Sequence, residues 1–247
     1  QLSTSMLTVQ RMTQLMTLIS LAACWWVAHR LSRNDLGTWG YFRLLCFTVL
    51  MTFLAFLCKE NGALLPLYVA ATSYWILHDK AAHNPAATRA YFIALLLPIA
   101  AVIAYLAWKA VTWQDYGLRN FTPWERLFTE SRIVWDYLGQ ILVPRLNGSG
   151  IFHDDIVVSR GLTSPLSTLP AILGIVGIVA ACVIKRRSWP LLTFGVAWFL
   201  GGHLMESTTL PLELYFEHRN YFPMVGALIA SGIAVASITN KKIHAAA

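Results

Sequence analysis

The sequence predicts an all-α polytopic membrane protein with about seven transmembrane helices and an interfacial amphipathic helix in a long outer loop. Two properties of the composition indicate this class, because 57% of the residues are hydrophobic and only 13% are charged. An average soluble domain carries about 25% charged residues. The third observation is a succession of apolar runs close to the length of about 17 to 25 residues that a transmembrane helix needs.

The apolar runs are separated from one another by polar or charged residues. They cover Met12–Leu31, Tyr41–Cys58, Gly62–Leu77, Tyr91–Trp108, Leu166–Ile184, Trp189–Leu204 and Tyr221–Thr239. The third run is short and contains Pro66, so we expect it to be tilted, broken or re-entrant. We expect residues 1–247 to form a single membrane domain. Because the chain begins at Gln1 and its first apolar run lacks the features of a signal peptide, we also expect it to be a fragment of a longer protein.

Basic residues are sorted between the two sides of the predicted membrane. Alternating spans place on one side Arg30, Arg33, Arg43, Lys80, Arg89, Lys185, Arg186, Arg187, Lys241 and Lys242. Short loops rich in lysine and arginine face the cytoplasm. We therefore predict that the opposite, acid-rich side is periplasmic or lumenal. This sorting accounts for the net charge of +7, so we expect no nucleic-acid partner.

The long loop over residues 109–165 lies on the predicted outer side. Within it, apolar residues recur at helical spacing over 124–143, and charged residues such as Arg126 and Glu130 take the other positions. This pattern predicts an amphipathic helix at the membrane interface, with Trp124 and Trp135 at headgroup depth. The alternative is a helix packed on the rest of the outer region.

Three clusters of ionisable residues fall on the outer side. They are Lys59-Glu60-Asn61, His153-Asp154-Asp155, and a polar segment over Glu206–Pro223 that contains Glu217, His218 and Arg219. Ionisable groups at a bilayer boundary are costly to place and are usually functional. Each cluster combines a basic group able to hold phosphate with an acid able to bind a hydroxyl group or a proton. We expect the three clusters to converge on one cavity.

Structural alternatives exist for each cluster. Lys59 and Glu60 would also solvate a tight connection between helices, and the two aspartates would suit a solvated turn or, less favourably, a divalent cation. Glu217 and Arg219 would also form an ion pair that anchors helix ends. The chain has no HExxH motif, and its four cysteines show no pairing pattern, so we expect neither a metalloprotease site nor a disulfide or zinc site. We assign no metal ligands and no cofactor from these residues, and a divalent metal stays the less favoured alternative.

Four segments together resemble a known family. They are Leu7-Thr-Val-Gln-Arg-Met12, Cys58-Lys-Glu-Asn-Gly-Ala-Leu-Leu-Pro66, Phe152-His-Asp-Asp155 with Ser159-Arg-Gly-Leu162, and Glu217-His-Arg-Asn-Tyr-Phe-Pro223. The sequence resembles bacterial integral membrane glycosyltransferases of GT-C architecture, relatives of the tetratricopeptide-linked protein O-mannosyltransferases. The resemblance runs through nearly the whole chain, and its elements keep their order and their spacing to the apolar runs.

The resemblance implies an activity and a site. In such enzymes a sugar passes from a polyprenyl-phosphate donor to a protein or glycan acceptor on the periplasmic face of the inner membrane. The residues that would bind substrate and lipid phosphate are Arg219, Lys59, His218, Arg11, Asn61 and Tyr221. Arg219 is the favoured phosphate ligand because a guanidinium fork matches phosphate oxygens.

The match to this family has one important departure. The family's acidic base lies in the first outer loop, which we expect to precede this sequence, and its soluble repeat domain would follow it. Glu60, Asp154 and Glu217 are the substitutes for that base in this chain. Two other functions remain open. The arginines of the long loop would suit an O-antigen polymerase or ligase, whereas a secondary transporter would need charged groups near mid-membrane.

Overall fold

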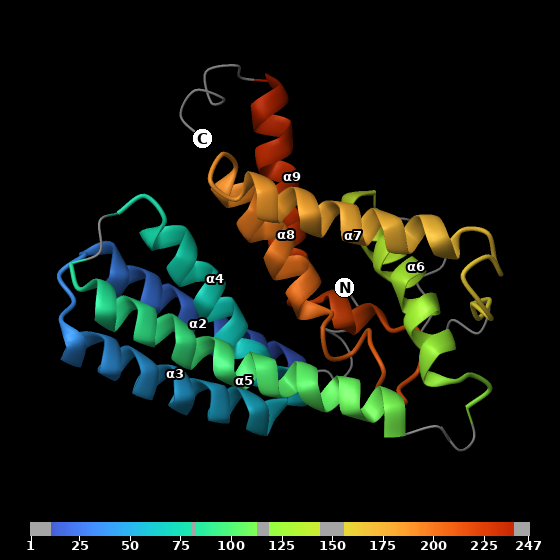
Figure 1. Ribbon diagram of the computed structural model, residues 1–247, viewed down its shortest axis with the longest axis horizontal. Coiled ribbons are helices and arrows are strands. Elements are labelled where there is room, and N and C mark those ends of the chain that lie inside the picture. The colour runs from blue at the N-terminus through green and yellow to red at the C-terminus, as the bar shows by residue number, and fades with distance from the viewer. Residues whose placement is uncertain (1–10, 81–82, 113–118, 144–155, 240–247) are drawn as a thin grey trace. The chain divides into compact units, whose positions relative to one another are not determined.

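The computed structural model describes residues 11–80, 83–112, 119–143 and 156–239, and these residues are helical with no β-strand. The chain divides into two compact units, one up to Ile103 and one from Ala104 to the C-terminus, with the boundary inside helix α5. Figure 1 shows the helices of both units. The prediction of an all-α protein is confirmed, and that of a single membrane domain stays a prediction.

The first unit is built from α2 (Arg11–Ser32), α3 (Thr38–Cys58), the 3₁₀ turn η2 (Glu60–Leu64), α4 (Leu65–Leu77) and the first part of α5 (Pro85–Thr112). Helices α2, α3 and α4 pack against one another around apolar side chains such as Val27, Leu44 and Val69. The hydroxyl groups of Ser73 and Tyr91 lie 3.0 Å apart and join α4 to α5 inside this core. A buried polar pair of this kind satisfies both groups where no water can.

The turn between α3 and α4 depends on Gly62. Its N–H donates to the Lys59 carbonyl at 2.8 Å, which closes the 3₁₀ turn. A Cβ atom at Gly62 would lie 2.2 Å from the carbonyl carbon of Ala55, so only glycine lets the turn approach α3 this closely.

The second unit contains α6 (Pro123–Leu142), α7 (Thr168–Lys185), α8 (Pro190–Gly202), the 3₁₀ turn η3 (Glu217–Asn220) and α9 (Met224–Thr239). Helices α8 and α9 form its most extensive contact (Figure 1). A Cβ atom at Gly226 would lie 2.4 Å from the Gly195 carbonyl oxygen, so these two glycines set the close approach of the helices. Helix α6 packs on α7, where the Trp135 ring covers Gly174 and its Nε1 donates to the Ala171 carbonyl at 3.0 Å.

Helix α6 starts at a capping box. The Thr122 hydroxyl accepts from the Glu125 N–H at 3.3 Å, and the Glu125 carboxylate accepts from the Thr122 N–H at 2.8 Å. The helix, Pro123–Leu142, begins and ends within one residue of the predicted 124–143. Its packing on α7 and α9 corresponds to the alternative interpretation, a helix packed on its own unit, and its position relative to a membrane interface stays a prediction.

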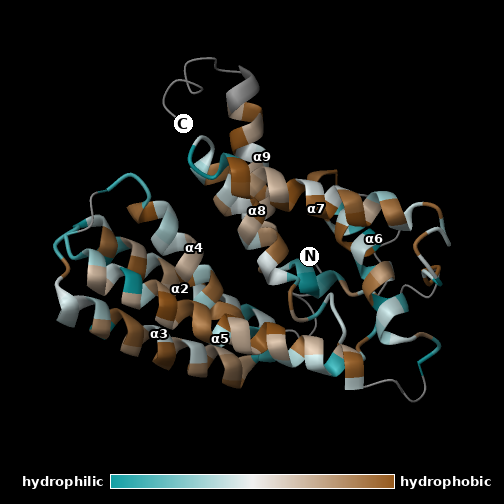
Figure 2. Cartoon of the chain, viewed as in Figure 1, coloured by the Kyte–Doolittle hydropathy of each residue, from teal (hydrophilic) through white to brown (hydrophobic). Residues whose placement is uncertain are grey.

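Four helices are long and apolar enough to cross a membrane, namely α2, α3, α5 and α7. Many of their large apolar side chains are exposed, as in Phe53 of α3, Leu97 of α5 and Val176 of α7. Figure 2 shows hydrophobic residues along much of the length of these helices. Exposed apolar surface of this extent is typical of a membrane-facing wall, so the structure supports a membrane protein.

The count of about seven spans is not confirmed, because three of the predicted spans are shorter helices. Helices α4 and α8 have 13 residues each and α9 has 16. At a rise of about 1.5 Å per residue, these lengths reach about 20 to 24 Å, against about 30 Å for the hydrocarbon core. In each case residues at one end of the apolar run lie outside the helix: Gly62–Leu64 belong to the 3₁₀ turn before α4, His203 and Leu204 follow α8, and residues 221–223 form a turn before α9.

Candidate functional site

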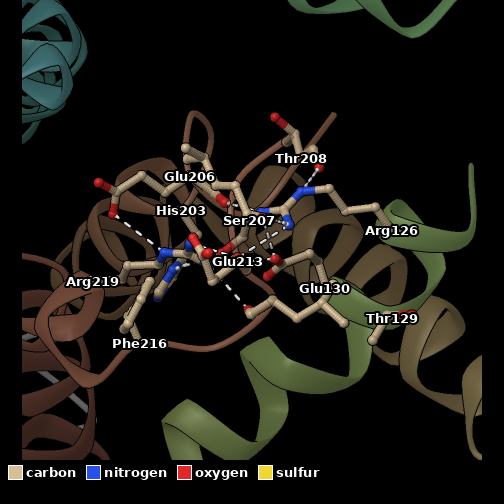
Figure 3. A network of polar contacts seen from close by, with 12 residues as sticks. Arg126, Thr129, Glu130, His203, Glu206, Ser207, Thr208, Glu213, Phe216 and Arg219 are labelled. Carbon is tan, nitrogen blue, oxygen red and sulfur yellow. Dashed lines mark hydrogen bonds and ion pairs between the residues drawn. The ribbon is translucent and has the colours of Figure 1, made fainter. Parts of the chain in front are cut away.

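A cluster of buried ionisable residues lies in the second unit and forms the candidate site (Figure 3). Helix α6 contributes Arg126 and Glu130, the turn after α8 contributes His203 and Glu206, and η3 contributes Arg219. All five side chains are almost completely buried. We call these five residues the buried ion cluster. Charges removed from water at this depth are stable only when they are paired and hydrogen-bonded.

Arg126 organises the loop that follows α8. Its guanidinium group donates to the backbone carbonyls of Glu206, Thr208, Leu212 and Glu213, and its Nη2 lies 2.7 Å from Oε1 of Glu130. The 206–213 segment is not helical over much of its length, so its carbonyl groups need donors from elsewhere once they are buried. A single arginine supplies them.

Arg219 faces the same cluster from the other side. Its Nη1 and Nη2 donate to the carbonyls of Leu214 and Glu213 at 3.0 and 2.6 Å. The guanidinium group also lies 3.5 Å from Glu130 and 3.9 Å from Glu206, and it covers the Phe216 ring. Arg219 therefore forms ion pairs with Glu130 and Glu206, and the expected pair of Arg219 with Glu217 stays a prediction.

Glu130 occupies the centre of the cluster, between the two arginines. Burial raises the pKa of its carboxyl group to about 7, although Arg126, Arg219 and the Ser207 hydroxyl lower it. Neither carboxylate oxygen accepts a hydrogen bond of regular geometry from the described residues. A carboxyl group in this range is able to exchange a proton near neutral pH.

His203 is a neutral member of the cluster. Burial lowers its pKa to about 4, in spite of the nearby Glu206 carboxylate, which raises it. Its ring stacks on Tyr137 with a centroid distance of 5.4 Å, and Nδ1 lies 3.3 Å from the Ser207 hydroxyl. Its Nε2 has no hydrogen-bond partner within the described part of the chain. One ring nitrogen is therefore available to a ligand.

Two tyrosines hold the segment before η3 against α6. The Tyr137 hydroxyl accepts from the Phe216 N–H at 2.9 Å and donates to the Phe216 carbonyl at 3.1 Å. The Tyr215 hydroxyl donates to the Asp136 carboxylate at 2.9 Å. Both contacts fix the backbone that carries Arg219.

A groove of about 390 Å³ runs beside the cluster, between α6, α7 and the end of α8. Its apolar walls include Leu127, Val134, Ile172, Ile175, Val176, Val179, Leu200 and Leu204. Its polar side consists of Glu130, Ser131, His203, Ser207 and Thr208. Val176 and Val179 belong to α7 and are themselves exposed, so the groove opens along the surface of a helix able to span a membrane. We call it the α7 groove.

The structure places the residues predicted for the site in different surroundings. Arg219 is buried in the cluster, whereas Glu217, His218 and Tyr221 beside it are half-buried. Lys59 is half-buried, Glu60 exposed and Asn61 buried, all at η2 of the first unit, and Arg11 is exposed at the start of α2. Their convergence with the polar segment stays a prediction. His153, Asp154 and Asp155 lie outside the described residues.

Two residues of the cluster contradict the sequence-based interpretation of α6. Arg126 and Glu130 were expected among the polar positions of an amphipathic helix, and both are fully buried. The spacing of Arg126, Glu130, Ile133 and Tyr137 places them on one face, and this face packs under the 206–216 segment. The sequence signal for this burial was that Arg126 and Glu130, four residues apart, share a helix face with the apolar residues Ile133 and Tyr137. In the described part of the chain, no group of three or more His, Cys, Asp or Glu side chains is placed to hold a metal ion.

Comparison with known proteins adds no relative, since no family model, no curated protein and no solved structure matches this chain.

Proposed function

We propose that this chain is part of a membrane glycosyltransferase that transfers a sugar from a polyprenyl-phosphate donor to a hydroxyl group of a protein or glycan acceptor. The α7 groove carries the proposal, because it joins an apolar channel along a helix of spanning length to a polar side at Glu130, His203 and Ser207. A lipid-linked sugar has this division, with a long apolar chain and a hydrophilic head. We propose that the active face is opposite the side that carries the sorted basic residues, and that it is the periplasmic face of a bacterial inner membrane, as the resemblance implies.

In the proposed reaction, the acceptor oxygen attacks the anomeric carbon of the sugar. The bond from that carbon to the phosphate oxygen breaks, its electron pair stays on the polyprenyl phosphate, and the acceptor proton passes to a carboxylate. Glu217 and Glu60 are the described candidates for this carboxylate, and Asp154 is the third. Because the N–H groups of Arg219 already contact carbonyl and carboxylate oxygens, we assign to Arg219 a positioning role for the 206–220 segment, in addition to its favourable charge for a nearby phosphate.

The two alternative functions receive less support from the described residues. The polymerase or ligase function depends on arginines free to hold a pyrophosphate. Arg119 pairs with Glu213, Arg160 with Glu125, and Arg132 donates to the Val157 carbonyl. The transporter function depends on charges in mid-membrane, whereas the buried ion cluster draws on α6 and on segments that connect α8 to α9.

The proposal is tested by filling the groove in the intact protein. Membranes that contain the protein are incubated with a panel of radiolabelled polyprenyl-phosphate sugars, and sugar incorporation into acceptors is measured. We expect Val176→Trp, which places an indole in the groove, to lower transfer at least tenfold. The control Val183→Trp changes an exposed valine of the same helix outside the groove and should leave transfer unchanged. If the unaltered protein transfers no sugar from any donor of the panel, the proposed function is wrong.

A further inference from the structure

A short turn joins α7 to α8 (Figure 1), and three consecutive basic residues, Lys185, Arg186 and Arg187, lie at its start. We call the segment Lys185–Trp189 the basic turn. We propose that the basic turn and an adjacent apolar hollow bind one anionic phospholipid, with its phosphate at the basic residues and one acyl chain in the hollow. Such a site is separate from the polar side of the α7 groove and is independent of the reaction proposed for the groove.

The basic turn presents positive charge that no nearby acid neutralises. Its three basic side chains are exposed, and none of them pairs with an acid among the described residues. The sequence has no aspartate or glutamate over 156–205 or after Glu217, so α7, α8 and α9 carry no carboxylate side chain. The turn also belongs to the predicted cytoplasmic side, whose leaflet carries anionic lipids. The phosphate of such a lipid is the complementary partner.

The side chains of the basic turn keep hydrogen-bond donors for a ligand. Arg186 donates one N–H to the Val183 carbonyl at 2.7 Å, and a guanidinium group carries five such donors. The Lys185 ammonium group lies 5.6 Å from the centroid of the Trp189 ring and donates no hydrogen bond within the described part of the chain. Trp189 is itself exposed, and tryptophan is enriched at the depth of the headgroups. Charged donors at this depth hold phosphate oxygens.

An apolar hollow of about 220 Å³ lies between α6, α7, α8 and α9, and we call it the four-helix hollow. Its almost entirely apolar lining includes Leu138, Ile178, Leu192, Val196, Ala230 and Ala234. It adjoins the α7 groove at Val134, Ile175 and Leu200, which belong to both linings. A hollow of this composition favours hydrocarbon over water.

The four-helix hollow and the basic turn are close enough for one lipid to reach both. Ile178 precedes Lys185 on α7 by about 10 Å, at about 1.5 Å per residue, and Leu192 lies in the first turn of α8. The headgroup layer of a bilayer is about 5 to 8 Å thick. With the basic turn in that layer, the hollow begins in the adjoining hydrocarbon, where the acyl chain of the same lipid lies.

The inference is tested with two photoreactive lipids that differ only in the headgroup. Phosphatidylglycerol and phosphatidylcholine, each with a diazirine in one acyl chain, are added in trace amounts to the protein in phosphatidylcholine nanodiscs, and labelled peptides are identified by mass spectrometry. Each basic residue near an anionic lipid contributes about fivefold in affinity. We therefore expect the phosphatidylglycerol probe to label peptides covering 192–196 and 230–234 at least tenfold more than the phosphatidylcholine probe. Excess dihexanoyl phosphatidylglycerol should suppress this labelling, whereas glycerol 3-phosphate, which carries the anion without a chain, should not.

Matched charge variants show whether the label depends on the basic turn. The triple variant Lys185→Gln, Arg186→Gln and Arg187→Gln should lower phosphatidylglycerol labelling at least tenfold. The control removes the same charge from three exposed positions of the first unit and should retain the labelling; it combines Arg33→Gln, Arg43→Gln and Arg89→Gln.

A second pair of variants tests the hollow. Ala234→Trp places an indole in the four-helix hollow and should abolish the labelling, whereas Val235→Trp, at the next position of α9 and outside the lining, should retain it. Both residues are exposed, so neither change disturbs the buried ion cluster. Equal labelling by the two lipids, labelling that persists in the basic-turn variant or in Ala234→Trp, or suppression by glycerol 3-phosphate would overturn the inference.

Discussion

Replacement of Arg126 by methionine is expected to destabilise the second unit more than any exposed charge change. Methionine keeps an unbranched side chain of similar reach but donates no hydrogen bond. The change leaves Glu130 without its partner at 2.7 Å, and it leaves the carbonyls of Glu206, Thr208 and Leu212 without the donor that Arg126 supplies.

The magnitude follows from these contacts. Removal of one partner of a buried ion pair costs about 3 to 5 kcal/mol, and each buried carbonyl that loses its donor costs about 1 kcal/mol or more. The sum is at least about 6 kcal/mol, which is comparable to the whole stability of many domains. With about 2 to 4 °C per kcal/mol for a unit of this size, we expect the Tm to fall by at least about 10 °C.

The assay is thermal unfolding in detergent, followed by tryptophan fluorescence, together with limited proteolysis of the 204–217 segment. Arg119→Met is the matched control, because Arg119 forms a partly exposed pair with Glu213 and should change the Tm by less than about 4 °C. The double variant Arg126→Met with Glu130→Met should recover about half of the loss, since it removes the orphaned charge. If Arg126→Met lowers the Tm no more than Arg119→Met does, the assigned role of Arg126 is wrong.

Three further predictions concern other parts of the chain. Gly226→Ala should destabilise the protein by about 1 to 3 kcal/mol because the added Cβ meets the Gly195 carbonyl at 2.4 Å. Gly232→Ala, at a position of the same helix with open space around it, should be neutral or stabilising, and equal Tm values for the two variants would contradict the packing argument. His203 has a folded-state pKa near 4 against an ordinary value of 6.5, so its contribution is complete above pH 6.5 and is lost as the pH falls toward 4. The Tm difference between the unaltered protein and His203→Gln should therefore shrink over this range by the equivalent of about 3 kcal/mol, and a constant difference would refute it. In a variant without the natural cysteines, Glu60→Cys should react with an impermeant thiol reagent outside intact cells and Arg187→Cys only after lysis, and the reverse pattern would overturn the predicted sidedness.

The sequence by itself determined the helical class and most helix positions. The apolar runs led to α2, α3, α5 and α7, and the Thr122–Glu125 capping box with Pro123 marks the start of α6. These features are local, since helix signals depend on residues within one or two turns of each other. The lengths of α4, α8 and α9 were overestimated, because hydropathy does not distinguish a helix from apolar turn residues that precede or follow it.

Only the tertiary structure decided which charges meet. Arg126 and Glu130 lie on α6, more than seventy residues before Glu206 and Arg219, and their polar character favoured a water-facing position when the helix was considered alone. Arg126 and Glu130 are buried because α6 covers the carbonyl groups of residues 206–214. These carbonyl groups require hydrogen-bond donors that their own backbone does not provide, and the arginines supply them. The α7 groove arises in the same way, from the space that three helices leave between them. No pattern within a single helix contains that information.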